Sequence, residues 1–252
     1  VARFNRNTTT GAIAQPAGTA GCVSETGAGP CANGHGLAGA NGVAVSPNGK
    51  SVYVTSGSSS AVVRLNRGTA AGALAQPAGS AGCVSEDGTG PCADGHGLSG
   101  PRRVAVSPDG KSVYVASDGS SAVARFNRNT TTGAIAQPAG SAGCVSETGA
   151  GPCANGHALM APHSVAVSAD GKSVYVASFF SQAVARLNRN PTTGAIGQPA
   201  GSFGCVSETG AATCADGHGL NNPTGVAVSL DGKSVYVTSS SSDAVARFNR
   251  AP

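Results

Sequence analysis

VAVSPDGKSVYVAS, residues 104 to 117, consists of two strand-like runs joined by a short polar turn. Valine alternates with small residues before the turn, and SVYVAS after it is rich in residues that favour strands. Pro108-Asp109-Gly110 supplies the residue types that a hairpin turn requires. This stretch therefore predicts an antiparallel β-hairpin.

The hairpin is one part of a unit of 61 residues that repeats along the chain. The phrase VARFNRNTTTGAIAQPAG at Val1 returns in close copies at Val62, Val123 and Val184, and a short fifth copy, VARFNR, begins at Val245. We therefore expect a single domain over residues 1–252, with repeats 1–61, 62–122, 123–183 and 184–244 and a surplus strand at 245–252.

Each 61-residue period contains four strand-like runs. Counted from the first hairpin of the chain, they cover residues 42–46, 51–56, 61–67 and 72–79. No helical period of useful length is present. The pattern predicts an all-β fold: a β-propeller of four repeats, with four antiparallel strands per blade and long, disulfide-stapled loops between blades. We expect the N-terminal strands to pair with the last hairpin and so close the ring without exposed strand edges.

Two stretches carry a resemblance to a known family. VAVSPDGKSVYVAS and VAVSLDGKSVYVTS, residues 226 to 239, resemble the YVTN-type bacterial β-propeller repeats of the lactonase-like propeller superfamily. The resemblance implies a propeller of the kind found in extracytoplasmic surface proteins and in lactonase-like propellers. Two features depart from it: the long insertion from Gln15 to Leu37, and four repeats where lactonase-like relatives usually have seven blades.

Composition excludes several classes of function. The net charge is +4, and the arginines are spread along the repeats rather than clustered, which indicates a solvated strand face rather than a nucleic-acid interface. The chain has no apolar run long enough to insert into a membrane. No cofactor motif is present, and we expect none to bind.

The cysteines recur in pairs with eight residues between them. An even number of locally paired cysteines in glycine-rich loops predicts one disulfide per repeat and an oxidising compartment. Each bridge should stabilise the fold by roughly 2.5–3 kcal/mol on the chain-entropy model. The predicted location is therefore secreted or cell-surface, and the resemblance to bacterial propeller repeats implies a bacterium. The pairs are Cys22/Cys31, Cys83/Cys92, Cys144/Cys153 and Cys205/Cys214.

A histidine follows each second cysteine by four residues. This C-x3-H spacing fits neither covalent haem attachment nor the usual zinc pairs, so we predict no metal site. A metal would bind only if the four histidines converged on the ring axis: His35, His96, His157 and His218. The glutamates after the first cysteines are interpreted as solvated loop residues: Glu25, Glu86, Glu147 and Glu208.

The repeats differ from one another in two short windows. The first covers residues 38–42, 99–103, 160–164 and 221–225, just before the first strand of each hairpin; the second covers 57–60, 118–121, 179–182 and 240–243, just after the second strand. In an antiparallel blade these windows lie at the same end, so one face of the disc should carry recognition. Its most distinctive residues are Arg102, Arg103, Met160, His163, Phe179 and Phe180.

These observations favour a non-enzymatic, secreted propeller that serves as a binding or structural module. Its partner would be a protein or a cell surface, with further copies of the chain as a candidate through the terminal strands. One alternative is a subunit of a surface filament or array, assembled by exchange of the surplus strand. The other is a lactonase-like hydrolase, which the repeat symmetry and the lack of a unique acid–base constellation disfavour.

Overall fold

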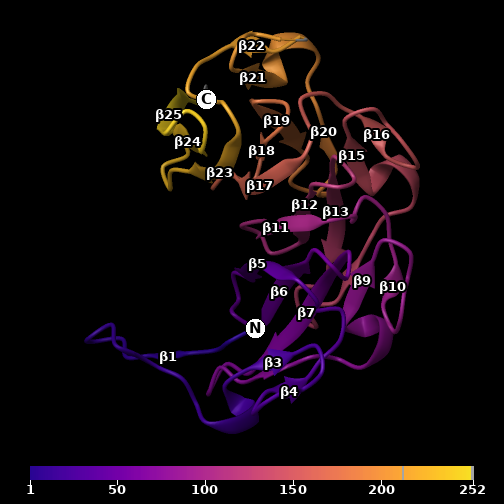
Figure 1. Cartoon of the computed structure of the whole chain (residues 1–252), viewed down its shortest axis with the longest axis vertical. Helices are drawn as coiled ribbons and strands as arrows, with labels where there is room; N and C mark the ends of the chain where they lie inside the picture. Colours follow the sequence, from indigo (N-terminus) through magenta and orange to yellow (C-terminus); the bar gives the residue numbers. More distant parts are fainter. Residues whose placement is uncertain (212, 251–252) are drawn as a thin grey trace.

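The computed structural model describes residues 1–211 and 213–250, and within them the fold is all-β and propeller-like, as predicted (Figure 1). The helices of these residues are short 3-10 turns of three residues each, and none is long or apolar enough to cross a membrane. These turns are η1 (Gly18–Ala20), η2 (Gly79–Ala81), η3 (Gly140–Ala142) and η4 (Gly201–Phe203).

The first complete sheet, here called the first blade, has six strands. Its first three strands, β5 to β7, form an antiparallel meander. The end of β7 pairs with β8 and its beginning with β9, so the outer strand is split by η2. The last strand, β10, runs parallel to β9. The strands are β5 (Ala40–Val45), β6 (Ser51–Ser56), β7 (Ala61–Arg67), β8 (Leu74–Ala75), β9 (Cys83–Ser85) and β10 (Ala93–Asp94).

Two further blades repeat this plan. The second blade contains β11 (Pro101–Val106), β12 (Ser112–Ser117), β13 (Ala122–Arg128), β14 (Ile135–Ala136), β15 (Cys144–Ser146) and β16 (Ala154–Asn155). The third contains β17 (Pro162–Val167), β18 (Ser173–Ser178), β19 (Ala183–Arg189), β20 (Ile196–Gly197), β21 (Cys205–Ser207) and β22 (Ala215–Asp216). The predicted inter-blade loop therefore supplies two short strands to the outer edge of each blade.

Shorter sheets stand at both ends of the chain. The last sheet consists of β23 (Pro223–Val228), β24 (Ser234–Ser239) and β25 (Ala244–Asn249). At the other end, β1 (Asn5–Arg6) pairs with β2 (Ile13–Ala14), and β3 (Val23–Ser24) pairs with β4 (Ala32–Asn33).

The sheets follow one another along an arc, with the first strand of each on the concave side (Figure 1). β5 contacts β11, β11 contacts β17, and β17 contacts β23. The hydrophobic core lies between neighbouring sheets: Tyr53 of the first blade and Leu98, in the segment between the two blades, pack with Val113 and Phe126 of the second. Because valine, alanine and leucine fill these interfaces, the fold needs no tryptophan.

The expected closure by the N-terminal strands is not what the structure contains. The last hairpin, β23–β24, is completed by β25, and among the described strands β1 pairs only with β2. Residues 245–249 are thus part of the third strand of the last sheet rather than a surplus; residues 251 and 252 lie outside the described residues. Pairing β25 with its sequence neighbour closes a far shorter loop than pairing with the other end of the chain.

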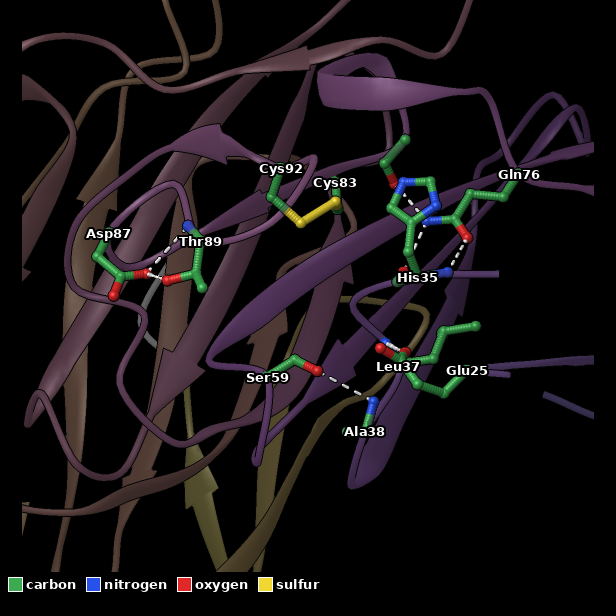
Figure 2. Close-up of a disulfide and its surroundings, with 11 residues drawn as sticks. Glu25, His35, Leu37, Ala38, Ser59, Gln76, Cys83, Asp87, Thr89 and Cys92 are labelled. Atoms are coloured by element: carbon green, nitrogen blue, oxygen red, sulfur yellow. Dashed lines mark hydrogen bonds between the residues drawn. A yellow bond between two sulfur atoms is a disulfide. The ribbon is translucent and has the colours of Figure 1, made fainter. Parts of the chain in front are cut away.

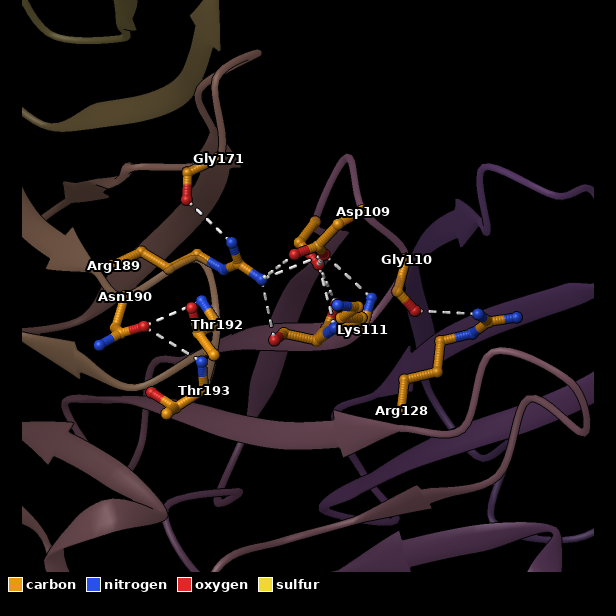
Figure 3. A network of polar contacts seen from close by, with 12 residues as sticks. Asp109, Gly110, Lys111, Arg128, Gly171, Arg189, Asn190, Thr192 and Thr193 are labelled. Atoms are coloured by element: carbon orange, nitrogen blue, oxygen red, sulfur yellow. Dashed lines mark hydrogen bonds and ion pairs between the residues drawn. The ribbon is translucent and has the colours of Figure 1, made fainter.

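Arginines at the ends of the third strands bind neighbouring blades to one another. Arg189 Nε donates to Tyr114 Oη at 2.7 Å, and Nη2 donates to Asp109 Oδ2 at 2.9 Å. Nη1 donates to the carbonyl oxygen of Gly171 in its own blade, also at 2.9 Å (Figure 3). Its side chain is 1% exposed, so the expectation of a solvated arginine face is wrong at this position.

The same contact recurs with small variations. Arg128 Nε donates to Tyr53 Oη at 2.6 Å, but the residue in the aspartate position is Asn48, whose Oδ1 accepts from Nη2 at 3.3 Å. Arg250 Nη2 donates to Asp170 Oδ2 at 2.7 Å. An arginine of this kind therefore joins each of these three pairs of neighbouring sheets, and its partner is acidic in two of them.

The four predicted disulfides are present, one in each repeat: Cys22–Cys31, Cys83–Cys92, Cys144–Cys153 and Cys205–Cys214. The Cys83–Cys92 bridge joins β9 to the residue before β10 and so holds the two outermost strands of the first blade together (Figure 2). Disulfides persist in oxidising compartments, so the four bridges indicate an extracytoplasmic location.

The setting of the bridges differs from the predicted one. The sequence placed them in a long loop between blades, but Cys31 directly precedes β4 and Cys214 directly precedes β22. β4 runs parallel to β3, and β22 runs parallel to β21. Cys214 is buried beside Ala158 and Ala183, whereas Cys31 is half-buried. The expectation of a loop between blades is therefore wrong at Cys83, Cys144 and Cys205, which lie in β9, β15 and β21, because this segment folds back and pairs as strands.

Candidate functional site

The first strands of the blades share one irregularity, at the end that faces the concave side of the arc. In β11, Pro101 pairs with Ser117 and Arg103 pairs with Ala116, so Arg102 is an extra residue that the partner strand does not match. Register shifts at the same place leave Asn41, His163 and Thr224 unmatched in β5, β17 and β23. Bulges of this kind redirect a side chain and are common next to active sites.

The local sequence explains where the bulge forms. The residue before each first strand has a left-handed backbone: φ is +59° at Gly100, +53° at Ala161 and +54° at Asn222. Proline follows in each of these three repeats and, lacking an N–H group, favours strand starts and bulges. Because of the sharp turn and the proline, the strand begins one residue out of register with its partner.

The four bulged residues converge on one cavity. Asn41, Arg102, His163 and Thr224 line it together with Ala40 and Arg103, and its volume is about 380 Å³. The four come from four different sheets, which meet along the concave side of the arc. The cavity thus holds two guanidinium groups and one imidazole, and each repeat contributes a different side chain at the same backbone position.

A carboxylate binds two of these side chains. Arg102 donates to Asp118 Oδ2 from Nε at 3.1 Å and from Nη2 at 2.7 Å. His163 Nε2 lies 3.5 Å from the same oxygen. Asp118 follows β12 directly, so the start of β11 and the end of its partner bring Arg102 and Asp118 together, and His163 comes from β17 of the next blade, which contacts β11. Their side chains are 46%, 24% and 21% exposed for Arg102, Asp118 and His163, respectively.

The surroundings keep His163 largely neutral at pH 7. Burial lowers the pKa of His163 below its ordinary value of 6.5, and the charges of Arg102 and Arg103 act in the same direction, while Asp118 opposes them. Arg103 Nη1 donates to the carbonyl oxygens of Asn41 at 3.0 Å and Arg102 at 3.3 Å. Within residues 1–211 and 213–250, no carboxylate lies within ion-pair distance of Arg103. The cavity therefore has an excess of positive charge.

Aromatic side chains extend the site on one side. The rings of Phe179 and His163 are stacked with centroids 4.6 Å apart, and Phe180 meets Phe179 edge-on at 5.2 Å. The backbone N–H of Phe180 donates to the carbonyl oxygen of Met160 at 3.2 Å, which places Met160 beside the pair. The site is thus charged over the bulged strands and apolar over the turn after β18.

The two variable windows do lie at the same end of the blades. Backbone hydrogen bonds join them in every repeat, for example from Asp118 to Gly100 and from Phe179 to Ala161. Of the predicted residues, Arg102, Arg103, His163 and Phe179 lie together, with Met160 and Phe180 at the rim. Three residues of the site were missed, although all lie inside these windows: Asn41, Asp118 and Thr224.

The repeated histidines are not part of this site. The backbone of His35 exchanges two hydrogen bonds of 2.8 Å with the side chain of Gln76 in the next repeat (Figure 2). His96 and His157 are bound in the same way, and the ring Nε2 atoms of these three histidines are buried without a partner. They do not converge, and no cluster of three His, Cys, Asp or Glu side chains fit for a metal occurs in the described residues.

The repeated glutamates have a structural role, although Glu25 is exposed and the other three are half-buried. The carboxylate of Glu25 accepts a hydrogen bond from the backbone N–H of Leu37, twelve residues later (Figure 2). The same bond joins Glu86 to Leu98 and, in the later repeats, Glu147 to Leu159 and Glu208 to Leu220. Each glutamate therefore closes the disulfide loop on the segment that leads to the next blade.

The cysteines likewise lie away from the cavity. Cys31 and Cys214 stand at the outer edges of their sheets, whereas the cavity is lined by the first strands on the concave side. The disulfides therefore support the blades and take no part in the site.

Residues 1–147 match the model of a protein family described as "Lactonase, 7-bladed beta-propeller". No curated protein matches the sequence. Among solved structures, a putative 6-phosphogluconolactonase from Bacteroides uniformis is 18% identical, with a TM-score of 0.61 over 99% of this chain and 60% of that one. The periplasmic gluconolactonase of Pseudomonas aeruginosa is 17% identical, with a TM-score of 0.58 and the same coverage.

A protein from Lactobacillus plantarum is 20% identical, with a TM-score of 0.59 over 84% of this chain and 51% of that one. At these identities the likeness concerns the fold alone. The chain spans 60% of the length of the Bacteroides protein. The family match nevertheless overturns the expectation of a non-enzymatic binding or structural module: the family is one of hydrolases, which was the disfavoured alternative.

Proposed function

Because the chain belongs to the lactonase, seven-bladed β-propeller family, we propose that it is a hydrolase that opens lactone rings in the cavity lined by the bulged residues. The observation that carries the proposal is the contact of Arg102, Asp118 and His163. At the position of each of these residues, the other three repeats have a different residue. Ring opening of a lactone needs a base for water and positive charge for the developing oxyanion. Both are present here.

His163 is the proposed general base. Its Nε2 lies 3.5 Å from Asp118 Oδ2, so in the proposed reaction the proton of the neutral ring sits on Nε2 and Nδ1 accepts a proton from water. The lowered pKa of His163 keeps the imidazole in the neutral form that this role requires. Water oxygen attacks the lactone carbonyl carbon as its proton passes to Nδ1. That proton then passes to the ring oxygen when the carbon–oxygen bond breaks, and the product is a hydroxy acid.

Arg103 is the proposed oxyanion partner. Its guanidinium donates to two backbone carbonyl oxygens at the cavity, and no carboxylate of the described residues lies within ion-pair distance of it. It is therefore free to donate to the carbonyl oxygen as that oxygen becomes negative. Arg102 is instead bound to Asp118 and acts as a positioning residue, since it fixes the carboxylate that orients His163.

Hydrolysis of glucono-δ-lactone and of γ-butyrolactone, followed by acid release at constant pH, tests this function. We expect turnover above the uncatalysed rate, a loss of about 10²-fold or more in His163→Gln, and no change in His218→Gln, the histidine of the last disulfide loop. Equal rates for wild type and His163→Gln would overturn the role of His163, and no turnover of any lactone would overturn the function.

Three finer assignments support this setting. We infer that one blade forms per 61-residue period, with its first two strands from one repeat and its outer strands from the next, and that the repeats are of the YVTN type, from VAVSPDGKSVYVAS and its copies. The four disulfides favour secretion or display at a bacterial surface. Fractionation of cells that make the native protein, with thiol titration of the product, tests the location: a cytoplasmic, reduced protein would contradict it.

A further inference from the structure

An apolar surface lies beside the charged cavity, on the side of His163. We call it the aromatic shelf, and it consists of Met160, Phe179 and Phe180. Phe180 is 64% exposed and Met160 is 47% exposed, although both are large apolar side chains. Phe179 connects them to the cavity, because its ring stacks on His163.

The shelf has no structural task that the other repeats require. The positions equivalent to Phe180 hold Ser58, Gly119 and Ser241, and those equivalent to Met160 hold Ala38, Ser99 and Asn221. These repeats form the same turn with small or polar residues. An exposed phenylalanine in this turn therefore adds nothing to the fold that serine does not, whereas it adds apolar area beside the cavity.

Its position relative to the charged groups determines what it can bind. Phe179 contacts His163, His163 lies 3.5 Å from Asp118, and Asp118 binds Arg102. A ligand whose polar end occupies the cavity therefore has its remaining part directed either to solvent or across the shelf. A purely polyhydroxylated substituent has few apolar groups to bury against phenyl rings and a thioether, whereas an alkyl or acyl chain loses water-exposed area there.

We propose that the aromatic shelf is the subsite for an apolar substituent of the substrate, and that the preferred substrates are lactones with an alkyl or acyl chain. This inference rests on the proposed function, because the cavity beside the shelf is assigned to the lactone ring. Phe180 is its specificity-determining residue, with Met160 as the second contact.

Chain-length preference tests the subsite. For wild type we expect kcat/KM for γ-decanolactone, which carries a hexyl chain, to exceed that for γ-butyrolactone about tenfold. Phe180→Ser, which places the residue of the first and last repeats in this turn, should remove most of that preference, and Met160→Ser should reduce it. The matched control is Phe203→Ala, because Phe203 is 77% exposed on η4, outside the site, and should leave the preference unchanged.

Binding of lactams, which resist hydrolysis, separates the subsite from the function. Calorimetry compares 5-hexyl-2-pyrrolidinone with 2-pyrrolidinone in wild type, Phe180→Ser and Phe203→Ala. If no lactone is hydrolysed but the hexyl lactam binds more tightly only when Phe180 is present, the subsite stands and the hydrolase assignment fails. If lactones are hydrolysed with no chain preference, or if Phe180→Ser and Phe203→Ala behave alike, the shelf proposal is overturned.

Discussion

Single side chains at equivalent backbone positions do different work in this protein. The bulge of the second blade carries Arg102, that of the third carries His163, and those of the outer sheets carry Asn41 and Thr224. Each bulge places its residue at the same cavity. One substitution per repeat is therefore enough to combine a guanidinium, an imidazole and two neutral polar groups there.

The state of His163 predicts how activity depends on pH. In the proposed reaction its neutral form is required, so kcat/KM should rise with pH through an apparent pKa below 6.5 and then level off. The negative charge of Asp118 raises the pKa of His163, so Asp118→Asn should shift the midpoint to lower pH; Arg103→Gln should shift it to higher pH. Rate profiles corrected for uncatalysed hydrolysis measure both, and a midpoint above 6.5 would contradict the assignment.

The contacts between blades offer a matched pair of substitutions. Asp109→Asn removes the ion pair with buried Arg189 but keeps an amide oxygen as acceptor, so the free energy of unfolding should fall by about 1–2 kcal/mol at pH 7. Asn48→Asp places a carboxylate beside Arg128 and should raise the free energy of unfolding by about 1 kcal/mol or less. Urea unfolding measures both changes. Opposite signs are the expected result.

The pH dependence of the first change has a definite sign. Burial of Asp109 would raise its pKa, but hydrogen bonds from Ser107, Lys111 and Arg189 outweigh it and lower the pKa below 3.8. A carboxyl group with a lowered pKa stabilises the fold above its unfolded value, and this is lost as the pH falls through the folded value. The difference between wild type and Asp109→Asn should therefore shrink below about pH 4. A difference that grows on acidification would contradict the ion pair.

At the scale of elements, the disulfide loop is part of the sheet rather than a tether outside it. β15 pairs with the start of β13, β16 pairs with β15, and the Cys144–Cys153 bridge joins these two outer strands. Cys144 is buried, and Gly97 from the preceding repeat packs against its side chain. The bridge thus supports both its own blade and the segment that enters it.

Removal of one bridge should cost a measurable part of the stability without changing the topology. For Cys144→Ser with Cys153→Ser we expect the free energy of unfolding to fall by about 2–3 kcal/mol, from the entropy of a short loop. Urea unfolding under non-reducing conditions measures it, and wild type treated with reductant is the comparison. A change below about 0.5 kcal/mol would show that the strand pairing alone holds the outer edge.

The elements also show what the sequence can predict. The hairpin of residues 104–117, the 61-residue period and the cysteine pairing predicted the all-β fold and the disulfides, because turn residues and alternation act locally. The bulges at Arg102 and His163 were not predicted: Pro101 and Pro162 are visible in the sequence, but a one-residue shift in register leaves no mark in the alternation of such short strands. The split outer strand was likewise hidden, because β8 and β14 have two residues each.

At the scale of the whole molecule, repetition builds the fold and departures from repetition build the site. Symmetry led to the wrong expectation of a non-enzymatic module, because chemistry was sought in the repeated glutamates and histidines. The glutamates make the same structural hydrogen bond in every repeat, as Glu25 does to Leu37, and three of the four histidines bind a glutamine of the next repeat. The proposed acid–base groups lie instead where the copies differ, and they become visible only when the sheets bring Arg102, Asp118 and His163 together.

A chain made symmetric at the site should therefore fold and be inactive. The variant replaces five site residues by their counterparts in the first repeat: Arg102→Asn, Arg103→Gly, Asp118→Gly, His163→Asn and Phe179→Gly. The fold uses these residues only at the cavity, so we expect all four disulfides to form and the free energy of unfolding to stay within about 2–3 kcal/mol of wild type. Lactone hydrolysis should fall to the uncatalysed rate.

The matched control makes the chain symmetric away from the site. Phe203→Ala and Leu230→Pro also restore residues of the first repeat, but on the outer edge and at the turn opposite the cavity, where both side chains are exposed. This control should keep full activity. Thiol titration, urea unfolding and the lactone assay on both variants give the result. An active site-symmetric chain would place the chemistry elsewhere. An unfolded one would mean that the differing residues hold the blades together, which the contacts around Arg189 and Arg128 already do without them.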